Sequence, residues 1–371
     1  MNYDVAIIGA GIVGAACAYS LSSAGLRVAV IDARGVSAGT TSAGMGHIVV
    51  MDDSPAQFAL TKYSQELWSQ IAPELPRQCE FENCGTLWVA ADDEEMAEVR
   101  RKHLLYAEKG ITSEILYAAA LNEAEPNLRP DMAGGLLVPS DKVVYQMFAT
   151  SYFLRRALDC GANLCLGKRA VDISADGVRL ENGGSVNAGY IVNAAGVNAP
   201  KLSPSLAITP RKGHLVVTDR YPDFVRHQIV ELGYLKSAHG HDSSSVAFNV
   251  QPRATGQVIV GSSRQFGVAD NKIDATMVRL MTARAFEYMP RLKTLSAIRV
   301  WTGSRPATPD NLPYIGPLTE NGNVFVAAGH EGLGITASLG TGQMIADMIV
   351  GHKPAIPVEP YSPFRKMATQ N

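Results

Sequence analysis

Three glycines near the start of the chain have a spacing that suits contact with phosphate groups. Gly9, Gly11 and Gly14 form G-x-G-x-x-G directly after the apolar run Val5-Ala6-Ile7-Ile8. Such glycines allow a tight turn, close approach of the backbone to a pyrophosphate, and close packing of a helix on a strand. The spacing alone is a weak signal, but here it lies between a predicted strand and a predicted helix rich in small residues. It therefore predicts a dinucleotide site.

A carboxylate follows at the position where such a site needs one. Asp32 ends the next apolar run, where it can accept a hydrogen bond from the adenosine ribose. Arg34 could suggest a 2′-phosphate, but Asp32 would repel that group, so we favour an Arg34 that is solvated or near the adenine. The dinucleotide contacts expected in this region are Gly9, Gly11, Ile12, Val13, Gly14, Asp32, Ala33 and Arg34.

A second cluster of hydroxyls and glycines lies in the stretch 40–46, shortly before a predicted helix. Such a turn can offer donors and bare backbone to phosphate and ribityl oxygens, or it can be an ordinary polar loop with an N-cap. Under the first interpretation, the contacts come from Thr40, Thr41, Ser42, Gly44 and Met45.

Two features near the C-terminus indicate the kind of cofactor and the kind of substrate. The glycine-rich stretch 327–336 leads into a predicted helix, so its backbone donors and the helix dipole can face the anionic ring of a reduced flavin. The resemblance to a known family described below implies that Gly332, Leu333, Gly334, Ile335 and Thr336 border the ring. Upstream, Arg305 is a candidate fork for a substrate carboxylate, although its residue type fits a surface ion pair equally well.

Other classes of site have little support in the sequence. His239 and His241 form an H-x-H pair, but no third ligand has matching spacing, so we predict no metal site. No nucleophile elbow or Cys–His arrangement is recognisable, which leaves the chemistry to the cofactor. The net charge is −2 and no basic run exists, so nucleic acid is not an expected partner.

The elements that must hold these residues alternate between strand and helix. Residues 5–8, 15–24 and 28–31 predict a strand–helix–strand unit, and 170–193 predicts an antiparallel excursion that returns to the parallel sheet. The alternative that Val5 to Leu21 spans a membrane is disfavoured by its three glycines. Further helices are expected at 56–71, 94–109, 147–160, 275–288 and 338–350, and a strand at 258–261.

Length and composition limit the organisation and location of the chain. Its 371 residues are enough for about two domains, and the 46% hydrophobic content supports a sizeable core. Pro and Gly are scattered rather than gathered in one linker, so we expect interleaved domains. Five cysteines without a C-x-x-C favour a reducing compartment, so we expect a protein of the cytoplasm, or peripheral on the inner membrane, with no integral membrane segment.

Taken in order, these segments resemble the D-amino acid oxidase family of FAD-dependent oxidoreductases. The resemblance rests on the following residues: the N-terminal glycines with Asp32, the turn Thr40 to Met45, Tyr190 to Gly196, Pro210-Arg211-Lys212-Gly213, Arg305-Pro306, Pro313 to Gly316, and Gly329 to Thr336. The resemblance implies an α/β fold in which a Rossmann-type FAD-binding domain (1–85, 141–205 and 302–371) is interleaved with a substrate domain (86–140 and 206–301). The second domain is expected to be built on a mainly antiparallel sheet.

The resemblance also implies roles for individual residues. Ala195 and Gly196 would lie at the FAD-binding sheet, and Val171, or its neighbour Ala170, would meet the adenine through its backbone. Arg305 corresponds to the carboxylate-binding arginine, and we assign Met45 and His47 to the substrate side. Covalent members attach FAD through a cysteine near 304–308, whereas this chain has no Cys after Cys165, so noncovalent FAD is expected.

One departure narrows the comparison within the family. Glycine oxidase-like members carry a second substrate-facing arginine in the loop before the last helix, where this chain has Glu331-Gly332-Leu333. The stretches 251–253, 256–264 and 329–332 look most like catalytic β subunits of heteromeric dehydrogenases, which include D-hydroxyproline dehydrogenase, opine oxidase and hydrogen cyanide synthase. Such a subunit would pass electrons to FMN or an iron–sulfur cluster associated with partner subunits.

The expected reaction is oxidation of an amino acid. We expect Arg305 to fix the carboxylate so that hydride passes from Cα to flavin N5, giving an imine. The preferred substrate is a D-amino acid or secondary amino acid, with 4-hydroxy-D-proline first. The alternatives are an autonomous glycine, sarcosine or D-amino acid oxidase that releases hydrogen peroxide, and an opine oxidase subunit.

Overall fold

The computed structural model describes residues 2–174, 176–233, 244–268, 270–319 and 322–366, so His239 and His241 lie outside the described residues. The chain forms two compact units. The first unit comprises Met1–Cys79, Tyr145–Arg211 and Ser304–Asn371, and the second comprises Glu80–Val144 and Lys212–Gly303.

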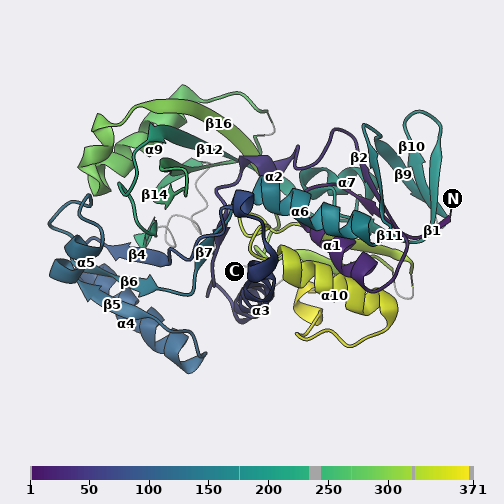
Figure 1. Ribbon diagram of the computed structural model, residues 1–371, viewed down its shortest axis with the longest axis horizontal. Helices are drawn as coiled ribbons and strands as arrows, with labels where there is room; N and C mark the ends of the chain where they lie inside the picture. Colours follow the sequence, from purple (N-terminus) through teal and green to yellow (C-terminus); the bar gives the residue numbers. More distant parts are fainter. Residues whose placement is uncertain (1, 175, 234–243, 269, 320–321, 367–371) are drawn as a thin grey trace. The chain divides into compact units, whose positions relative to one another are not determined.

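A mainly parallel sheet forms the centre of the first unit (Figure 1). Strand β1 (Asn2–Ile8) lies between β2 (Val28–Asp32) and β11 (Ser185–Asn193), and it is parallel to both. The order continues to β8 (Asn163–Leu166) beside β2, and to β18 (Val324–Ala328) and the antiparallel β17 (Tyr314–Pro317) beside β11. Residues 5–8 of β1 are buried because both faces of the sheet are covered, which explains their continuous apolar run.

Strands β9 (Ala170–Ser174) and β10 (Gly177–Leu180) form an antiparallel extension of this sheet and share an apolar cluster with its central strands. On one face, Ala6 and Ile31 pack with Val178 of β10 in this cluster. Strand β10 pairs antiparallel with both β9 and β11, which confirms the predicted excursion. The fold class predicted from the sequence is therefore correct for this unit.

The helices of the first unit pack closely through small residues. Helix α1 (Ile12–Ser23) contacts α6 (Gln146–Asp159) and α10 (Ser338–Val350), and α10 also contacts α3 (Pro55–Ile71). A Cβ on Gly342 would lie 2.6 Å from the backbone of Ala16, so α1 and α10 approach as only glycine allows. The remaining elements are α2 (Thr40–Ala43), β3 (His47–Ile48), α7 (Ala199–Leu202) and the 3-10 turns Ala72–Glu74, Arg77–Cys79, Gly196–Asn198 and Glu359–Tyr361.

Helix α1 begins three residues before its predicted start at Ala15. Gly11 is its extended N-cap residue, and Ala15 N donates to Gly11 O over 2.9 Å, so the glycine turn runs directly into the helix. Residues 5–21 therefore form strand, turn and helix. Within the described ranges, no helix combines the length and hydropathy that crossing a membrane requires.

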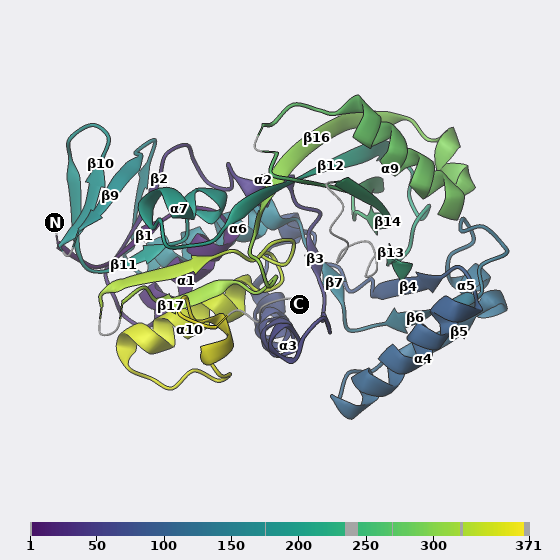
Figure 2. The ribbon, with the colours of Figure 1, turned by 180° about the vertical axis from the view of Figure 1, so that it is seen from behind.

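The second unit is built on a sheet that contains both parallel and antiparallel strand pairs (Figure 2). Its strand order is β16-β12-β15-β14-β13-β4-β6-β5. Strands β13 and β4 are parallel, whereas the pairs β13/β14, β14/β15, β4/β6 and β5/β6 are antiparallel. The strands are β4 (Thr86–Ala90), β5 (Glu114–Tyr117), β6 (Gly134–Val138), β12 (Thr209–Arg220), β13 (Gln228–Glu231), β14 (Ser244–Pro252), β15 (Gln257–Phe266) and β16 (Ala297–Ala307); β7 is Lys142–Val143.

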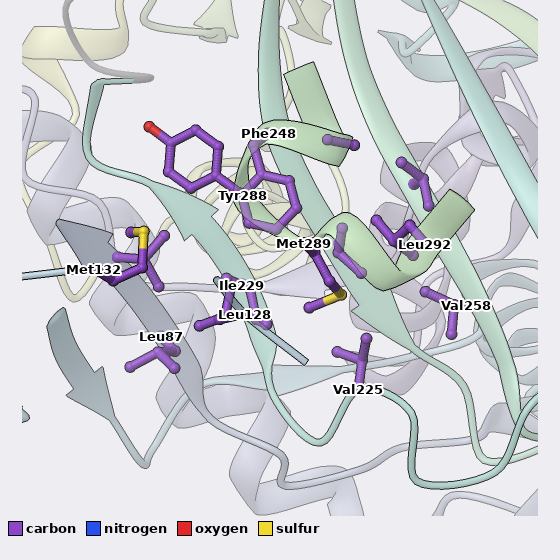
Figure 3. Close-up of a cluster of buried hydrophobic side chains, with 14 of the residues drawn as sticks. Leu87, Leu128, Met132, Val225, Ile229, Phe248, Val258, Tyr288, Met289 and Leu292 are labelled. Atoms are coloured by element: carbon purple, nitrogen blue, oxygen red, sulfur yellow. The ribbon is translucent and has the colours of Figure 1, made fainter. Parts of the chain in front are cut away.

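Helix α9 (Ala275–Tyr288) covers one face of this sheet and encloses the apolar core that Figure 3 shows. There Phe248 and Tyr288 stack with ring centroids 4.8 Å apart, next to buried Ile229 and Met289. Asp274 caps α9 by accepting from Thr276 N and Met277 N. The other helical elements of this unit are α4 (Asp93–Glu108), α5 (Ala118–Ala124) and the 3-10 turn Pro290–Thr294.

Candidate functional site

In the glycine turn after β1, the glycine positions leave little or no space for a side chain. Gly9 has a φ of +117°, and a Cβ there would collide with Ala194 O. A Cβ on Gly14 would collide with Gly9 O, and one on Gly11 would come 3.1 Å from Thr41 Oγ1. The turn is therefore a bare backbone surface at the N-terminus of α1, which suits an anionic ligand.

Asp32 lies beside this turn at the end of β2. Its Oδ2 accepts from Ala10 N at 2.9 Å, and its Oδ1 accepts from Arg34 N at 2.8 Å and Gly35 N at 3.0 Å. These bonds fix the carboxylate at the carboxyl edge of the parallel sheet, where such folds bind ribose. Arg34 itself is exposed, in keeping with the solvated interpretation.

The turn of residues 40–46 connects two parts of the site. Its first residues form the short helix α2, which the sequence did not reveal. Thr41 Oγ1 accepts from Ile12 N at 3.0 Å, and Thr40 Oγ1 donates to Ser304 O at 2.7 Å. One threonine thus ties the turn to the glycine loop, and the other ties it to the residue before Arg305.

Gln146 is a polar residue of this region that the sequence reasoning missed. It is buried at the start of α6, and its Nε2 donates to Gly44 O at 2.7 Å. Its Oε1 has no hydrogen-bond partner within the described part of the chain. A Cβ on Gly44 would lie 2.8 Å from Ile335 Cδ1, so the turn also touches the C-terminal loop.

Thr336 anchors the C-terminal loop on the segment that follows the turn. Its Oγ1 donates to His47 O at 2.9 Å and accepts from Val49 N at 3.3 Å, while Trp68 Nε1 donates to Thr336 O at 3.1 Å. Gly334 lies near the glycine loop, because a Cβ on it would be 4.0 Å from Val13 Cγ2. The loop preceding α10 is therefore held next to both earlier segments.

Two histidines of this region are kept neutral. Desolvation by the surrounding protein lowers the pKa of His47 to about 3. The same cause lowers the pKa of the buried His330 to about 3, and its Nε2 is 2.9 Å from Thr341 Oγ1. Neither imidazole carries a positive charge near neutral pH.

Arg305 lies in β16 beside the C-terminal loop. A Cβ on Gly332 would be 3.9 Å from both Cδ and Nε of Arg305. The neighbouring residue, Glu331, donates from its backbone N to Pro306 O at 3.0 Å. Its carboxylate pairs with Arg211, with 3.1 Å between Arg211 Nη1 and Glu331 Oε1. Arg305, which is partly buried, thus lies where the glycine-rich loop meets β16.

The sheet residues assigned from the resemblance lie in two places. Ala194 N donates to Ile8 O and Ala195 N to Asn193 Oδ1, so Ala195 and Gly196 directly follow β11 beside the glycine turn. Val171 lies in the outer strand β9 and is 37% exposed. The segment that leads to it passes the site, because Lys168 N donates to Asp32 O at 2.9 Å.

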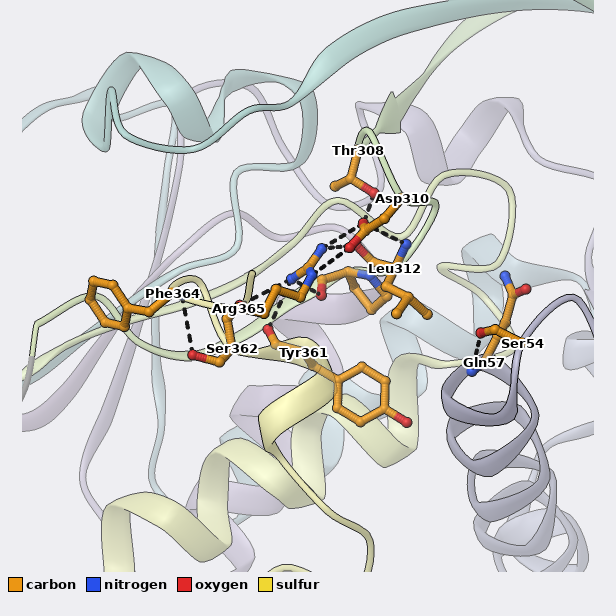
Figure 4. A network of polar contacts seen from close by, with 10 residues as sticks. Ser54, Gln57, Thr308, Asp310, Leu312, Tyr361, Ser362, Phe364 and Arg365 are labelled. Atoms are coloured by element: carbon orange, nitrogen blue, oxygen red, sulfur yellow. Dashed lines mark hydrogen bonds and ion pairs between the residues drawn. The ribbon is translucent and has the colours of Figure 1, made fainter. Parts of the chain in front are cut away.

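An ion pair near the C-terminus holds the loop that follows Arg305 (Figure 4). Arg365 Nε and Nη2 donate to the two carboxylate oxygens of Asp310 at 2.6 and 2.8 Å, and its guanidinium also donates to the backbone O of Leu312 and Pro313. Burial opposes ionisation of Asp310, but the hydrogen bonds and charge of Arg365 hold its pKa below the usual value. The loop 310–313 therefore has a fixed shape.

The comparisons with known proteins agree with this arrangement. The family model DAO, FAD dependent oxidoreductase, matches residues 4–348. The chain belongs to this family. It is 28% identical to glycine oxidase of Geobacillus kaustophilus over 97% of this chain and 96% of that protein. It is 26% identical to hydrogen cyanide synthase subunit HcnC of Pseudomonas aeruginosa over 96% and 94%.

Solved structures are similar over nearly the whole length of this FAD-dependent oxidoreductase. Glycine oxidase from G. kaustophilus matches with a TM-score of 0.90 and 27% identity, covering 99% of this chain and 100% of that chain. L-Proline dehydrogenase from P. horikoshii matches with a TM-score of 0.89 and 25% identity, covering 98% and 97%. The fold expected from the sequence is confirmed, and FAD is the cofactor of the family.

The residues of the first unit fit this cofactor. The bare turn at Gly9 and Gly14 leaves a surface that a side chain would fill, and the Asp32 carboxylate lies beside this turn at the end of β2. Ser37, whose N donates to Ala10 O, is buried, and its Oγ has no hydrogen-bond partner in the described residues. A dinucleotide offers acceptors for such groups. In the described ranges, no group of three or more His, Cys, Asp or Glu side chains could hold a metal ion.

Proposed function

We propose that this chain oxidises the C–N bond of a D-amino acid or secondary amino acid, with Arg305 binding the substrate carboxylate. The observation that carries the proposal is the position of Arg305 next to Gly332, on a strand that Thr40 ties to the turn of residues 40–46. A planar guanidinium binds a carboxylate through two parallel hydrogen bonds, which orients as well as attracts it.

The first unit would hold FAD through segments that already contact one another. The Gly9–Gly14 turn would take the pyrophosphate, Asp32 the ribose, and the backbone of 332–336 the flavin ring. Val171 is proposed to meet the adenine through its backbone, and Ala195 and Gly196 are proposed to contact FAD at the sheet. Bound noncovalently, FAD would supply the acceptor, at flavin N5, for the hydride that leaves the substrate Cα, and the substrate would become an imine.

The chain's own residues would orient the substrate rather than exchange protons with it. Arg305 would fix the carboxylate, and Met45 and His47 would face the rest of the molecule. Because its pKa is about 3, His47 would be a neutral neighbour and not a proton donor near neutral pH. The substrate amine must be neutral for its lone pair to assist hydride loss, and solvent is our candidate for removing its proton.

For the substrate, we favour 4-hydroxy-D-proline, and for the assembly, a β subunit of a heteromeric dehydrogenase. Two similar proteins support this choice: L-proline dehydrogenase, because proline is a cyclic secondary amino acid, and HcnC, because it is a subunit of hydrogen cyanide synthase. Partner subunits would then carry FMN or an iron–sulfur cluster. We propose a cytoplasmic location, or a peripheral one at the inner membrane.

A second candidate is an autonomous oxidase that reduces oxygen to hydrogen peroxide, which the likeness to glycine oxidase favours. Peroxide measured during aerobic turnover of the isolated chain separates the two. A rate of peroxide release equal to the rate of substrate consumption would identify an oxidase. Slow release with fast reduction of an artificial electron acceptor would identify a dehydrogenase.

The decisive experiment for the proposal is anaerobic bleaching of the bound flavin by a panel of amines. The panel should hold D-amino acids, cyclic imino acids, N-methyl amino acids and opines. Arg305→Ala should keep bound FAD but lose about 100-fold or more in kcat/KM for carboxylate substrates. Arg299→Ala, an exposed arginine of the same strand, is the matched control. Unchanged kinetics in Arg305→Ala would refute the assignment.

A further inference from the structure

The side chain of Gln146 connects helix α6 to the turn of residues 40–46. Gln146 is the first residue of α6 and is only 3% exposed. Its Nε2 donates to Gly44 O at 2.7 Å, although the two residues are 102 positions apart in the sequence. The proposed reaction assigns no role to this side chain.

This turn runs from the glycine turn to the loop before α10. At its start, a Cβ on Gly11 would lie 3.1 Å from Thr41 Oγ1. Three residues later, a Cβ on Gly44 would lie 2.8 Å from Ile335 Cδ1 in the C-terminal loop. Under the cofactor contacts proposed above, Thr41 therefore lies toward the pyrophosphate of FAD, and Gly44 lies toward the flavin ring.

The backbone of Gly44 needs support from outside the turn. The closeness of Ile335 leaves no space for a side chain at this position, and a residue without Cβ restricts its own φ and ψ least. The carbonyl of Gly44 and the N–H of Met45 belong to one planar peptide, so a hydrogen bond to the carbonyl fixes the directions of both groups. The bond from Gln146 Nε2 thus orients a peptide between two residues that we propose contact the cofactor.

The other half of the amide argues against a purely stabilising role. Gln146 Oε1 is buried and has no hydrogen-bond partner within the described ranges of the chain. A buried acceptor without a partner costs at least as much free energy as one hydrogen bond contributes, so the amide as a whole adds little to the stability of the fold. Its distinctive effect is the orientation that Nε2 gives to the Gly44–Met45 peptide.

We infer that Gln146 is a positioning residue for the flavin half of FAD, which acts through the Gly44–Met45 peptide. Supporting hydrogen bonds of this kind hold the groups that contact a ligand in the geometry that the ligand needs. Gln146 therefore raises the affinity for FAD but not for ADP, which lacks the ribityl chain and the flavin ring. The inference rests on the proposed cofactor contacts and does not depend on the identity of the substrate.

The test compares FAD with ADP on the 371-residue chain after its cofactor has been removed by dialysis. Gln146→Met keeps a similar volume and removes both Nε2 and Oε1. Its dissociation constant for FAD should rise about tenfold or more, while that for ADP should change by less than about twofold. Its Tm without cofactor should stay within about 2 °C of the wild type. Equal loss of affinity for both ligands, or an unchanged affinity for FAD, would overturn the inference.

A measurement on the FAD-loaded protein keeps the test decisive if the chain does not stay folded without cofactor. On dilution, Gln146→Met should release FAD about tenfold faster than the wild type, and the visible circular dichroism of the flavin that is still bound should differ. Wild-type release with an unchanged dichroism spectrum would contradict the inference. Gln343→Met, which removes an amide that donates to Asp347 within α10, is the matched control and should behave as the wild type does.

Failure of this inference and failure of the proposed function have different signatures. If Gln146→Met binds FAD normally and amino acids bleach its flavin, only the role of Gln146 is wrong. If the wild type binds FAD but no amino acid bleaches it, the proposed function is wrong. The comparison of FAD with ADP remains valid in that case, because it involves no substrate.

Discussion

Thr336 and His47 are 289 residues apart in sequence, yet the threonine hydroxyl donates to the histidine carbonyl oxygen over 2.9 Å. With the bond from Val49 N to the same hydroxyl, this contact fixes the loop before α10 on the segment after the 40–46 turn. The Thr336 hydroxyl is therefore placed to set the shape of the loop that we propose faces the flavin.

Replacing this hydroxyl should weaken both the fold and cofactor retention. Thr336→Val keeps the volume but leaves two buried backbone groups without their partner, at a cost of about 1–3 kcal/mol. We expect a lower Tm and faster loss of FAD on dilution, measured by flavin fluorescence. Thr282→Val in α9, whose hydroxyl donates to Val278 O and Arg279 O of its own helix, should retain FAD normally. Equal FAD loss in both variants would contradict the prediction.

Gly14→Ala should abolish cofactor binding. Its Cβ would meet the carbonyl oxygen of Gly9 well inside van der Waals contact, so α1 must move away from β1. Purified protein should lack the yellow colour or unfold at a clearly lower temperature. Gly35→Ala is the matched control, because a Cβ there meets nothing within 4 Å. A yellow, stable Gly14→Ala protein would show that the turn is more adaptable than the structure indicates.

The Asp310–Arg365 pair should make stability fall in acid. The pKa of Asp310 is lower in the folded than in the unfolded protein, so its contribution is present above about pH 4 and is lost as the pH falls through the folded pKa. Thermal unfolding between pH 5 and pH 3 should show a steeper loss for the wild type than for Asp310→Asn. Parallel curves for the two proteins would rule out this contribution.

His330 should act over a different pH range. Its pKa is about 3 in the fold and about 6.5 when unfolded, so the unfolded state binds the extra proton between these values. Stability should therefore decline as the pH falls from 6.5, by about 1.4 kcal/mol per pH unit for one proton. His330→Gln, which can still bond Thr341, should show a shallower decline in denaturant titrations at pH 7 and pH 5.

The local parts of the fold were predictable because each has a short-range cause. The βαβ unit at Gly9, the excursion through β9 and β10, and helices such as α9 and α10 follow from periodicity and glycine turns. The start of α1 was misplaced because Gly11 caps the helix without a polar side chain. The parallel pairing of β13 with β4 had no local signal, since it joins segments far apart in sequence.

The site residues that the sequence predicts have residue types with a recognisable chemical role, whereas the residues that it misses have types common on any protein surface. Asp32, Arg305 and the glycines stand out because their chemistry is unusual at those positions. Gln146 and Ser37 look like ordinary surface residues until burial leaves Gln146 Oε1 and Ser37 Oγ without a partner in the described chain. The Arg211–Glu331 pair could not be predicted because the partners meet only through the tertiary fold.

The three-part first unit also has a consequence for synthesis on the ribosome. Strand β1 emerges first, but its neighbour β11 ends at Asn193 and β18 ends at Ala328. Until residue 193 has been synthesised, the nascent β1 therefore lacks its partner β11, and until residue 328 the other edge of β11 lacks β18. Pausing or truncation before residue 328 should leave a chain that depends on chaperones, whereas the segments of the second unit are both complete by then.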